Sequence, residues 1–244
     1  MVMIRGKVEG QLAYVLHSYP YRETSLIVEA FTREHGRVAL VARGARRPRS
    51  AIRGLLLGFQ PLILDWSGKG EIFTLLKAEW QGGLPLLSGT ALFCGYYMNE
   101  LIMQLLPRED AHENLFDHYG EMLYRLACCG TGKVPEADLR WFEKCLLQEL
   151  GYGLLLDQTG NGEPIEPERF YLYEIEHGPV AIDQIHQVSP LIIQGSHLLD
   201  LAHDQFADIR SQQAAKNLMR ALLNHYLGDV ELKTRRIFKE LHDL

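Results

Sequence analysis

The sequence lacks the cysteine patterns of a metal site or a disulfide framework. Among its 244 residues are four cysteines, Cys94, Cys128, Cys129 and Cys145, and no two of them form a CxxC pair. Zinc sites and secreted disulfide scaffolds both depend on such regular spacing. We therefore expect reduced cysteines, no bound metal and no other cofactor.

Long apolar runs are missing as well. The first ten residues, MVMIRGKVEG, contain no apolar core of signal-peptide length. No stretch approaches the uninterrupted run of about 18 apolar residues that a membrane helix needs. These absences predict a cytoplasmic protein with no membrane partner.

Catalytic motifs are also absent. The chain has no complete phosphate-binding loop, no GxSxG and no HExxH, and its ten histidines are scattered. Catalytic residues can converge from distant segments without a motif. The sequence nevertheless favours a function that is not enzymatic.

Positive charge is scarce overall but concentrated near the N-terminus. The formal charge is -6, made up of +5 for residues 1–80 and -11 for residues 81–244. Such asymmetry indicates a polyanionic partner for the first part. Between His35 and Leu64 the chain has no Asp or Glu and six arginines: Arg37, Arg43, Arg46, Arg47, Arg49 and Arg53. A guanidinium group matches phosphate geometry, so these are candidate nucleic-acid contacts; the alternative is a solvated loop.

Residues 11–80 predict a small β-barrel. Segments typical of strands occupy 12–18, 25–32, 37–43, 55–66 and 71–80, with turn signals and no helical pattern between them. In the third segment Val38, Leu40 and Ala42 share one face and Arg37, Ala39, Val41 and Arg43 the other. Five strands of this size fit an OB-fold, although an SH3-like barrel stays open.

From Leu84 onward the apolar spacing becomes helical. We expect one helix from an N-cap at Ser88 to Leu106, and a second helix after a capping box formed by Asp110 and Glu113. A third helix within 134–153 ends at Gly151. The expected apolar stripes of the second and third helices are Leu115, Tyr119, Met122 and Leu126, and Leu139, Phe142, Leu146 and Leu150.

Three more helices are expected near 196–207, 211–227 and 232–242, after an irregular stretch that holds a strand at 169–175. The sequence therefore predicts an α+β protein of two domains. Residues 1–80 form the OB-fold barrel. Residues 81–244 form a mainly helical domain with a small non-helical insertion at 155–190.

Two further features bear on nucleic-acid binding. The aromatic residues interleaved with the barrel segments, Tyr14, Tyr19, Tyr21 and Phe31, are either core residues or a surface on which unpaired bases stack. The segment LKTRRIFKEL carries Lys233, Arg235 and Arg236. These cations are candidate nucleic-acid contacts; the alternative is favourable placement of cations in a helix.

The chain resembles the RecO family of bacterial recombination mediators. The resemblance rests on AYVLHSYPYRETSLIVEAFTREHGRVALVARGARRPRS at 13–50, YYMNELIMQLLP at 96–107, LRWFEKCLLQELGYG at 139–153 and LKTRRIFKEL at 232–241. It implies an N-terminal OB-fold and a helical C-terminal domain. It also implies binding to single- and double-stranded DNA, annealing of single strands, and, with the partner RecR, loading of RecA onto DNA covered by single-stranded-DNA-binding protein (SSB).

The resemblance also implies roles for particular residues. The segment RGARRPRS matches the family's basic barrel loop, so its arginines are expected to contact the DNA backbone. The acidic tail of SSB is expected to dock on the helical domain, with Arg140, Leu139 and Phe142 as the candidate site. The alternative for Arg140 is a pairing four residues along the helix, with Glu136 or near Lys144, on a solvated face.

The chain departs from the family in one respect. Many members carry a four-cysteine zinc site after the LGY segment, whereas LLLDQTGNGEP has no cysteine here. Two other functions stay open: an adaptor that binds only proteins, and an RNA-binding OB-fold protein.

Overall fold

The computed structural model describes residues 6–129, 136–184, 189–206 and 208–242. The chain divides into two compact units, Met1–Lys133 together with Leu232–Leu244, and Val134–Glu231. The expected boundary at residue 80 coincides with the last residue of the barrel. As a division into domains, it stays a prediction.

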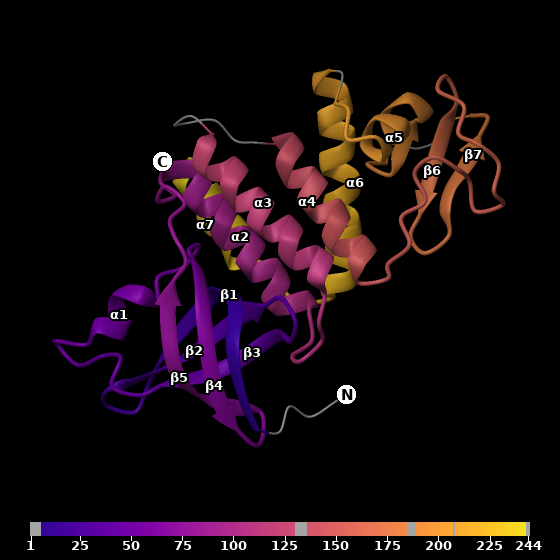
Figure 1. Cartoon of the computed structure of the whole chain (residues 1–244). Coiled ribbons are helices and arrows are strands. Elements are labelled where there is room, and N and C mark those ends of the chain that lie inside the picture. The colour runs from indigo at the N-terminus through magenta and orange to yellow at the C-terminus, as the bar shows by residue number, and fades with distance from the viewer. Residues whose placement is uncertain (1–5, 130–135, 185–188, 207, 243–244) are drawn as a thin grey trace. The chain divides into compact units, whose positions relative to one another are not determined.

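Five strands form a closed barrel in the first unit (Figure 1). They are β1 (Gly6–Tyr21), β2 (Ser25–Thr32), β3 (Gly36–Ala42), β4 (Pro61–Gly68) and β5 (Ile72–Trp80). The order around the barrel is β1-β2-β3-β5-β4, and every pairing is antiparallel except that of β3 with β5. A short helix, α1 (Ala51–Leu55), lies between β3 and β4 in sequence. The predicted barrel of the OB type is confirmed.

One strand prediction was wrong at its start. Residues 55–66 were expected to be extended, but Leu55 ends α1 and β4 begins only at Pro61. Leu56 and Phe59 are buried in this connection, and Phe59 has a positive φ of 68°. An apolar run shows that a segment is buried, but not whether it is a strand or a packed turn.

The barrel interior contains the alternate residues of the strands. Val38, Leu40 and Ala42 of β3 point inward as expected, and Trp66 and Phe73 are the largest side chains among them. Because each strand contributes every second residue, the outward-facing residues remain for other contacts. The barrel therefore leaves the outer face of β1, β2 and β3 for helices or ligands.

Part of that outer face is covered by α2 (Gly89–Leu105) and α3 (Glu113–Cys128). The ring of Tyr14 lies 5.2 Å from Phe116 and 5.1 Å from Tyr119, and Phe31 lies 5.3 Å from Phe116. The Tyr119 hydroxyl donates to Asn99 Oδ1 at 2.6 Å, and Asn99 Nδ2 donates to the Leu16 carbonyl at 2.8 Å. Burial raises the pKa of Tyr119 well above its usual value. Tyr14 and Phe31 are thus core residues.

The connection between α2 and α3 is attached to the turn between β2 and β3. The Glu109 amide donates to the Arg37 carbonyl at 2.9 Å. Arg33 binds Asp117 of α3 through Nε at 3.2 Å and Nη2 at 3.1 Å. Bidentate pairs of this kind fix orientation as well as distance. The barrel and the helix pair therefore meet through specific contacts.

The last helix of the first unit, α7 (Lys233–His242), begins on a carboxylate of α2. Glu100 accepts hydrogen bonds from the Lys233 amide at 2.8 Å, the Thr234 amide at 2.9 Å and the Thr234 hydroxyl at 2.6 Å. Free amides at a helix N-terminus favour a negatively charged acceptor. Glu100 thus caps α7 from a position 133 residues earlier in the chain.

The second unit combines three helices and a small sheet. The helices are α4 (Glu136–Glu149), α5 (Gly195–Ala202) and α6 (Ile209–Leu227). The strands β6 (Phe170–Glu174), β7 (Gly178–Ile182) and β8 (Ile192–Gln194) form a sheet in the order β7-β6-β8. The strand expected at 169–175 corresponds to β6, and β7 also lies within the expected insertion at 155–190, whereas β8 lies just beyond it.

The helix ends agree only partly with the sequence signals. Gly151 ends α4 as expected: its φ is +79°, its amide donates to the Gln148 carbonyl, and the Tyr152 amide donates to the Leu147 carbonyl. The Ser88 side chain makes no capping hydrogen bond, and α3 begins at Glu113 after His112, so the expected capping box was wrong. A capping motif needs the right backbone angles as well as the right residues.

No helix in the described part of the chain combines the length and the apolar character that a membrane crossing requires.

We predict that Gly36→Ala destabilises the first unit. Gly36 has a φ of 62°, and an added Cβ would lie 1.9 Å from the Asp110 carbonyl oxygen. The free energy of unfolding should fall by about 2 kcal/mol or more in urea titrations. Gly54→Ala is the control, because a Cβ there meets nothing within 4 Å and should change stability by less than about 1 kcal/mol. Equal stability of the two variants would contradict the attachment at the β2–β3 turn.

Candidate nucleic-acid interface

The arginine loop, residues 43–50, is anchored to the barrel through its backbone. Ala45 is fully buried in the barrel core. The Arg46 amide donates to the Thr24 carbonyl at 2.8 Å, and the Arg47 amide donates to the Gly44 carbonyl at 3.1 Å. Since the small residue points inward, the long side chains of the loop point outward.

The arginines of this segment are exposed and unpaired. No ion pair found among the described residues involves the guanidinium groups of Arg43, Arg46, Arg47, Arg49 or Arg53, all of which are exposed. Arg46 Nη1 makes a long hydrogen bond of 3.4 Å to the Arg22 carbonyl. The positive charge of the loop is therefore not neutralised by acidic partners within the described part of the protein.

The structure adds Arg22, which sequence reasoning missed. Arg22 is exposed in the turn between β1 and β2, with a φ of 51°, and its guanidinium carbon lies 5.2 Å from the Tyr21 ring centre. The pairing of Leu26 with Ala42 places this turn beside the arginine loop. The turn also contains one exposed acid, Glu23. We call the exposed arginines of the turn, the loop and α1 the basic cluster: Arg22, Arg43, Arg46, Arg47, Arg49 and Arg53.

Arg37 lies at the opposite end of β3 and is engaged within the protein. Its side chain is 15% exposed, and Nη1 lies 3.8 Å from the Glu29 carboxylate, which also pairs with Arg108. Burial lowers the pKa of Arg37, and Glu29 opposes that shift. Because Arg37 balances a buried carboxylate, we leave it out of the basic cluster.

Tyr19 is a further aromatic on the outer face of β1. It is 41% exposed, and its ring centre lies 4.4 Å from that of His17. Burial of the remainder raises the pKa of its hydroxyl, and the Glu29 carboxylate adds to this rise. Tyr19 is therefore uncharged at neutral pH.

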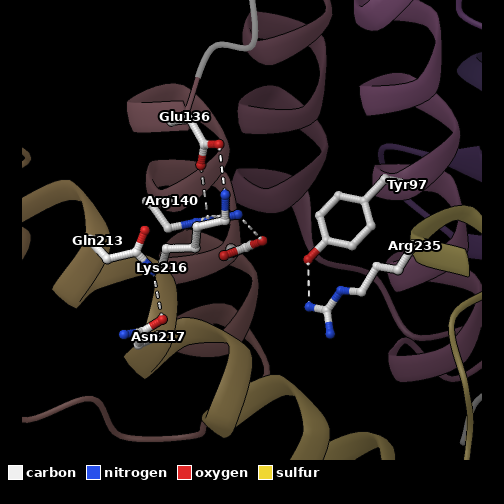
Figure 2. Close-up of polar contacts among 8 residues, drawn as sticks. Tyr97, Glu136, Arg140, Gln213, Lys216, Asn217 and Arg235 are labelled. Carbon is white, nitrogen blue, oxygen red and sulfur yellow. Dashed lines mark hydrogen bonds and ion pairs between the residues drawn. The ribbon is translucent and has the colours of Figure 1, made fainter. Parts of the chain in front are cut away.

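The cations of α7 are only partly directed to solvent. Arg235 Nη2 donates to the Tyr97 hydroxyl at 2.9 Å, as Figure 2 shows. Arg236 is exposed and lies 3.8 Å from Glu240, and Lys233 is exposed. Of the three candidates in LKTRRIFKEL, Arg235 thus holds α7 against α2, and Lys233 and Arg236 remain as candidate contacts.

In the second unit, Arg140 belongs to a buried network of charges between α4 and α6 (Figure 2). It is 7% exposed, its Nη2 donates to Glu143 Oε1 at 2.6 Å, and its Nη1 lies 3.6 Å from Glu136. Lys216 of α6 binds the same Glu136 at 2.9 Å. The alternative pairing of Arg140 with Glu136 is therefore present, and it joins a buried guanidinium to a half-buried carboxylate rather than two solvated groups.

The other two residues of the candidate tail site are also buried. Leu139 is 7% exposed and Phe142 is fully buried. The assignment of Arg140, Leu139 and Phe142 to docking of the SSB tail stays a prediction. Because all three residues are buried, a tail peptide could reach them only after a local rearrangement of the second unit.

The described residues contain no candidate metal site. Within these residues no group of three or more His, Cys, Asp or Glu side chains is placed to hold a metal ion. Cys94 and Cys145 are buried, and Cys128 is exposed. The candidate site consists of the exposed arginines of the basic cluster at one end of the barrel, with the exposed ring of Tyr19 on β1.

Comparison with known proteins identifies the family. Residues 8–83 match the model described as Recombination protein O N terminal, and residues 86–236 match that described as Recombination protein O C terminal. The chain belongs to the RecO family.

Several curated relatives share the whole length of the chain. The protein named DNA repair protein RecO from Dechloromonas aromatica (strain RCB) is 63% identical over 241 residues, covering 99% of each chain. The protein of the same name from Azoarcus sp. (strain BH72) is 50% identical over 244 residues, also covering 99% of each. The N-terminal RecO match contains the arginine loop and the turn beside it, so the basic cluster belongs to a RecO barrel.

We predict that Arg140→Glu strongly destabilises the second unit. The change would place a third carboxylate beside Glu136 and Glu143, and breaking a buried ion pair typically costs about 3–5 kcal/mol. The double variant Arg140→Met/Glu143→Leu removes both charges, so its free energy of unfolding should stay within about 1–2 kcal/mol of wild type. Lys216→Ala is the comparison at the half-buried end of the network, where only the pair with Glu136 is lost, and its expected cost is below about 1 kcal/mol. Denaturant titrations that show no loss for Arg140→Glu would contradict the buried network.

Proposed function

We propose that this RecO-family protein binds single-stranded DNA through the basic cluster and anneals complementary strands in DNA repair. The observation that carries the proposal is a set of six exposed arginines on one barrel edge in a chain with a net charge of -6. Arginine forks match the oxygen geometry of phosphates. The names of the curated relatives, DNA repair protein RecO, support the same context.

Annealing follows from charge neutralisation and needs no bond chemistry. Two complementary strands repel each other through their phosphates, and each arginine that binds a phosphate releases counterions and lowers that barrier. The barrel supplies a rigid base, because the loop is tied to the β1–β2 turn through Arg46 and Thr24. The proposed function is therefore that of a binding protein rather than an enzyme.

The proposal extends to partners through the family. The protein would act with RecR to load RecA onto DNA covered by SSB, and its helical part would bind the acidic tail of SSB. Double-stranded DNA is expected to bind through the same phosphate contacts. The exposed Lys233 and Arg236 of α7 form a second cationic surface that could bind DNA or the acidic tail of SSB.

Salt dependence tests the basic cluster. If three of its arginines contact phosphates, the log–log plot of affinity for a single-stranded oligonucleotide against salt should have a slope of about -2. Replacing Arg43, Arg46, Arg47 and Arg49 with alanine should flatten that slope without unfolding the protein, because these side chains are exposed. Fluorescence titration at several salt concentrations measures both.

The control for this prediction is Arg210→Ala/Arg220→Ala, which removes two exposed arginines of α6. Its slope should equal that of wild type. If the quadruple variant folds and keeps the wild-type slope, the arginine loop does not contact DNA and is only a solvated surface loop. Tighter binding of an RNA oligonucleotide of matched length would favour the RNA-binding alternative instead.

A separate titration tests the tail site. The Arg140→Met/Glu143→Leu variant lacks the guanidinium, and if Arg140 binds tail carboxylates its affinity for a synthetic SSB tail peptide should fall at least roughly tenfold. Annealing of bare DNA should be unchanged, because the basic cluster is intact. An affinity within twofold of wild type would confine Arg140 to its internal ion pairs and leave Lys233 and Arg236 as the next candidates.

A further inference from the structure

We propose that Tyr19 stacks on an unpaired base of the bound strand, on the outer face of β1, β2 and β3 near the basic cluster, with the tilted ring of His17 packed beside it. This inference rests on the proposed binding of single-stranded DNA. It names the barrel face on which the strand lies and the residue that contacts its bases.

The strand register places Tyr19 next to the arginines. Tyr19 pairs with Ile27, and Ile27 pairs with Val41, so these three side chains form one row across the outer face. Arg43 follows Val41 by two residues, is exposed, and is the first residue after β3. Tyr19 and Arg43 are thus separated by one strand, β2, and by two residues along the chain after Val41.

Tyr19 is the aromatic of this face with a ring open to a ligand. Tyr14 and Phe31 are buried against Phe116 and Tyr119 of α3. Tyr21 is half-buried and has the Arg22 guanidinium 5.2 Å from its ring centre. Tyr19 exposes 41% of its surface, and His17, also exposed, lies against it at 58° between ring planes. Half-buried Ile27 and Val41 complete an apolar floor.

The charges around Tyr19 suit a polyanion. On one side lie Arg22 and Arg43 of the basic cluster, and on the other Arg37 and Arg108 enclose Glu29. The Tyr19 hydroxyl, like that of an ordinary tyrosine, is protonated at neutral pH, and burial raises its pKa further, so it adds no negative charge near the phosphates. The Tyr19 ring is thus an uncharged stacking surface with arginines on both sides.

Stacking would serve annealing in a way that phosphate contacts alone do not. Bases in a duplex already stack on each other, so an exposed ring favours unpaired strands over paired ones. A stacked base also keeps its pairing edge free for the complementary strand. Tyr19 would therefore discriminate between substrate and product and release the annealed duplex.

The test compares a normal single strand with a strand of the same length made of abasic sites, which keeps the phosphates and loses the bases. Tyr19→Leu should bind the normal strand at least roughly fivefold more weakly than wild type. It should bind the abasic strand equally well, with an unchanged salt slope. Tyr19→Phe should retain wild-type affinity, because its ring can still stack. Tyr124→Leu, which removes an exposed tyrosine of α3, is the control and should change nothing.

Equal affinity of Tyr19→Leu and wild type for the normal strand would overturn the inference, as would an equal loss on both strands. If Tyr19→Leu does not fold, Tyr19→Thr removes the ring with a residue suited to strands and is compared in the same way. Failure of the proposed function gives a different result: wild type itself would bind neither strand with a salt-dependent affinity.

Discussion

Closure of the barrel between β3 and β5 is the constraint on which the candidate site depends. The two strands pair in parallel through only three positions, Ala39 with Ile72, Leu40 with Phe73 and Val41 with Thr74. Since β3 lies beside β5 rather than β4, the chain cannot return through a tight hairpin and must cross from β3 to β4 over residues 43–60. This crossing carries five of the six arginines of the basic cluster. A hairpin in its place would leave no room for them.

Two groups of arginines differ in their surroundings: some are paired inside the protein, and others are exposed with no acidic partner among the described residues. Arg37, Arg140 and Arg235 each bind a partner within their own unit, Glu29, Glu143 and Tyr97 respectively. A paired arginine contributes to stability and specificity of packing, whereas an unpaired exposed one contributes to the electrostatic attraction of a ligand. All five arginines between residues 43 and 53 are exposed and unpaired within the described part of the chain. Their closeness in the sequence therefore produces a positively charged patch on the surface.

Much of this arrangement could be predicted from local sequence. The alternation in residues 37–43 assigned Val38, Leu40 and Ala42 to the interior, and the run of arginines without acids predicted the candidate contacts of the loop. The misplaced start of β4 and the absent capping box show the limit of local patterns, because the same residues fit several backbone conformations. Strand register brings the turn with Arg22 beside the arginine loop, and the α2–α3 connection brings Arg108 to Glu29; local sequence patterns contain neither contact. Burial of Arg140 depends on partners on α4 and α6.

The most direct test of the account is amide hydrogen exchange with and without a single-stranded DNA oligonucleotide. The account predicts slower exchange in residues 19–25 and 43–53 on binding, because the strand would cover the β1–β2 turn, the arginine loop and α1. Exchange of the amides of β4 should be unaffected. Protection confined to α7 or to the second unit, with none in these two segments, would contradict the assignment of the DNA site to the barrel.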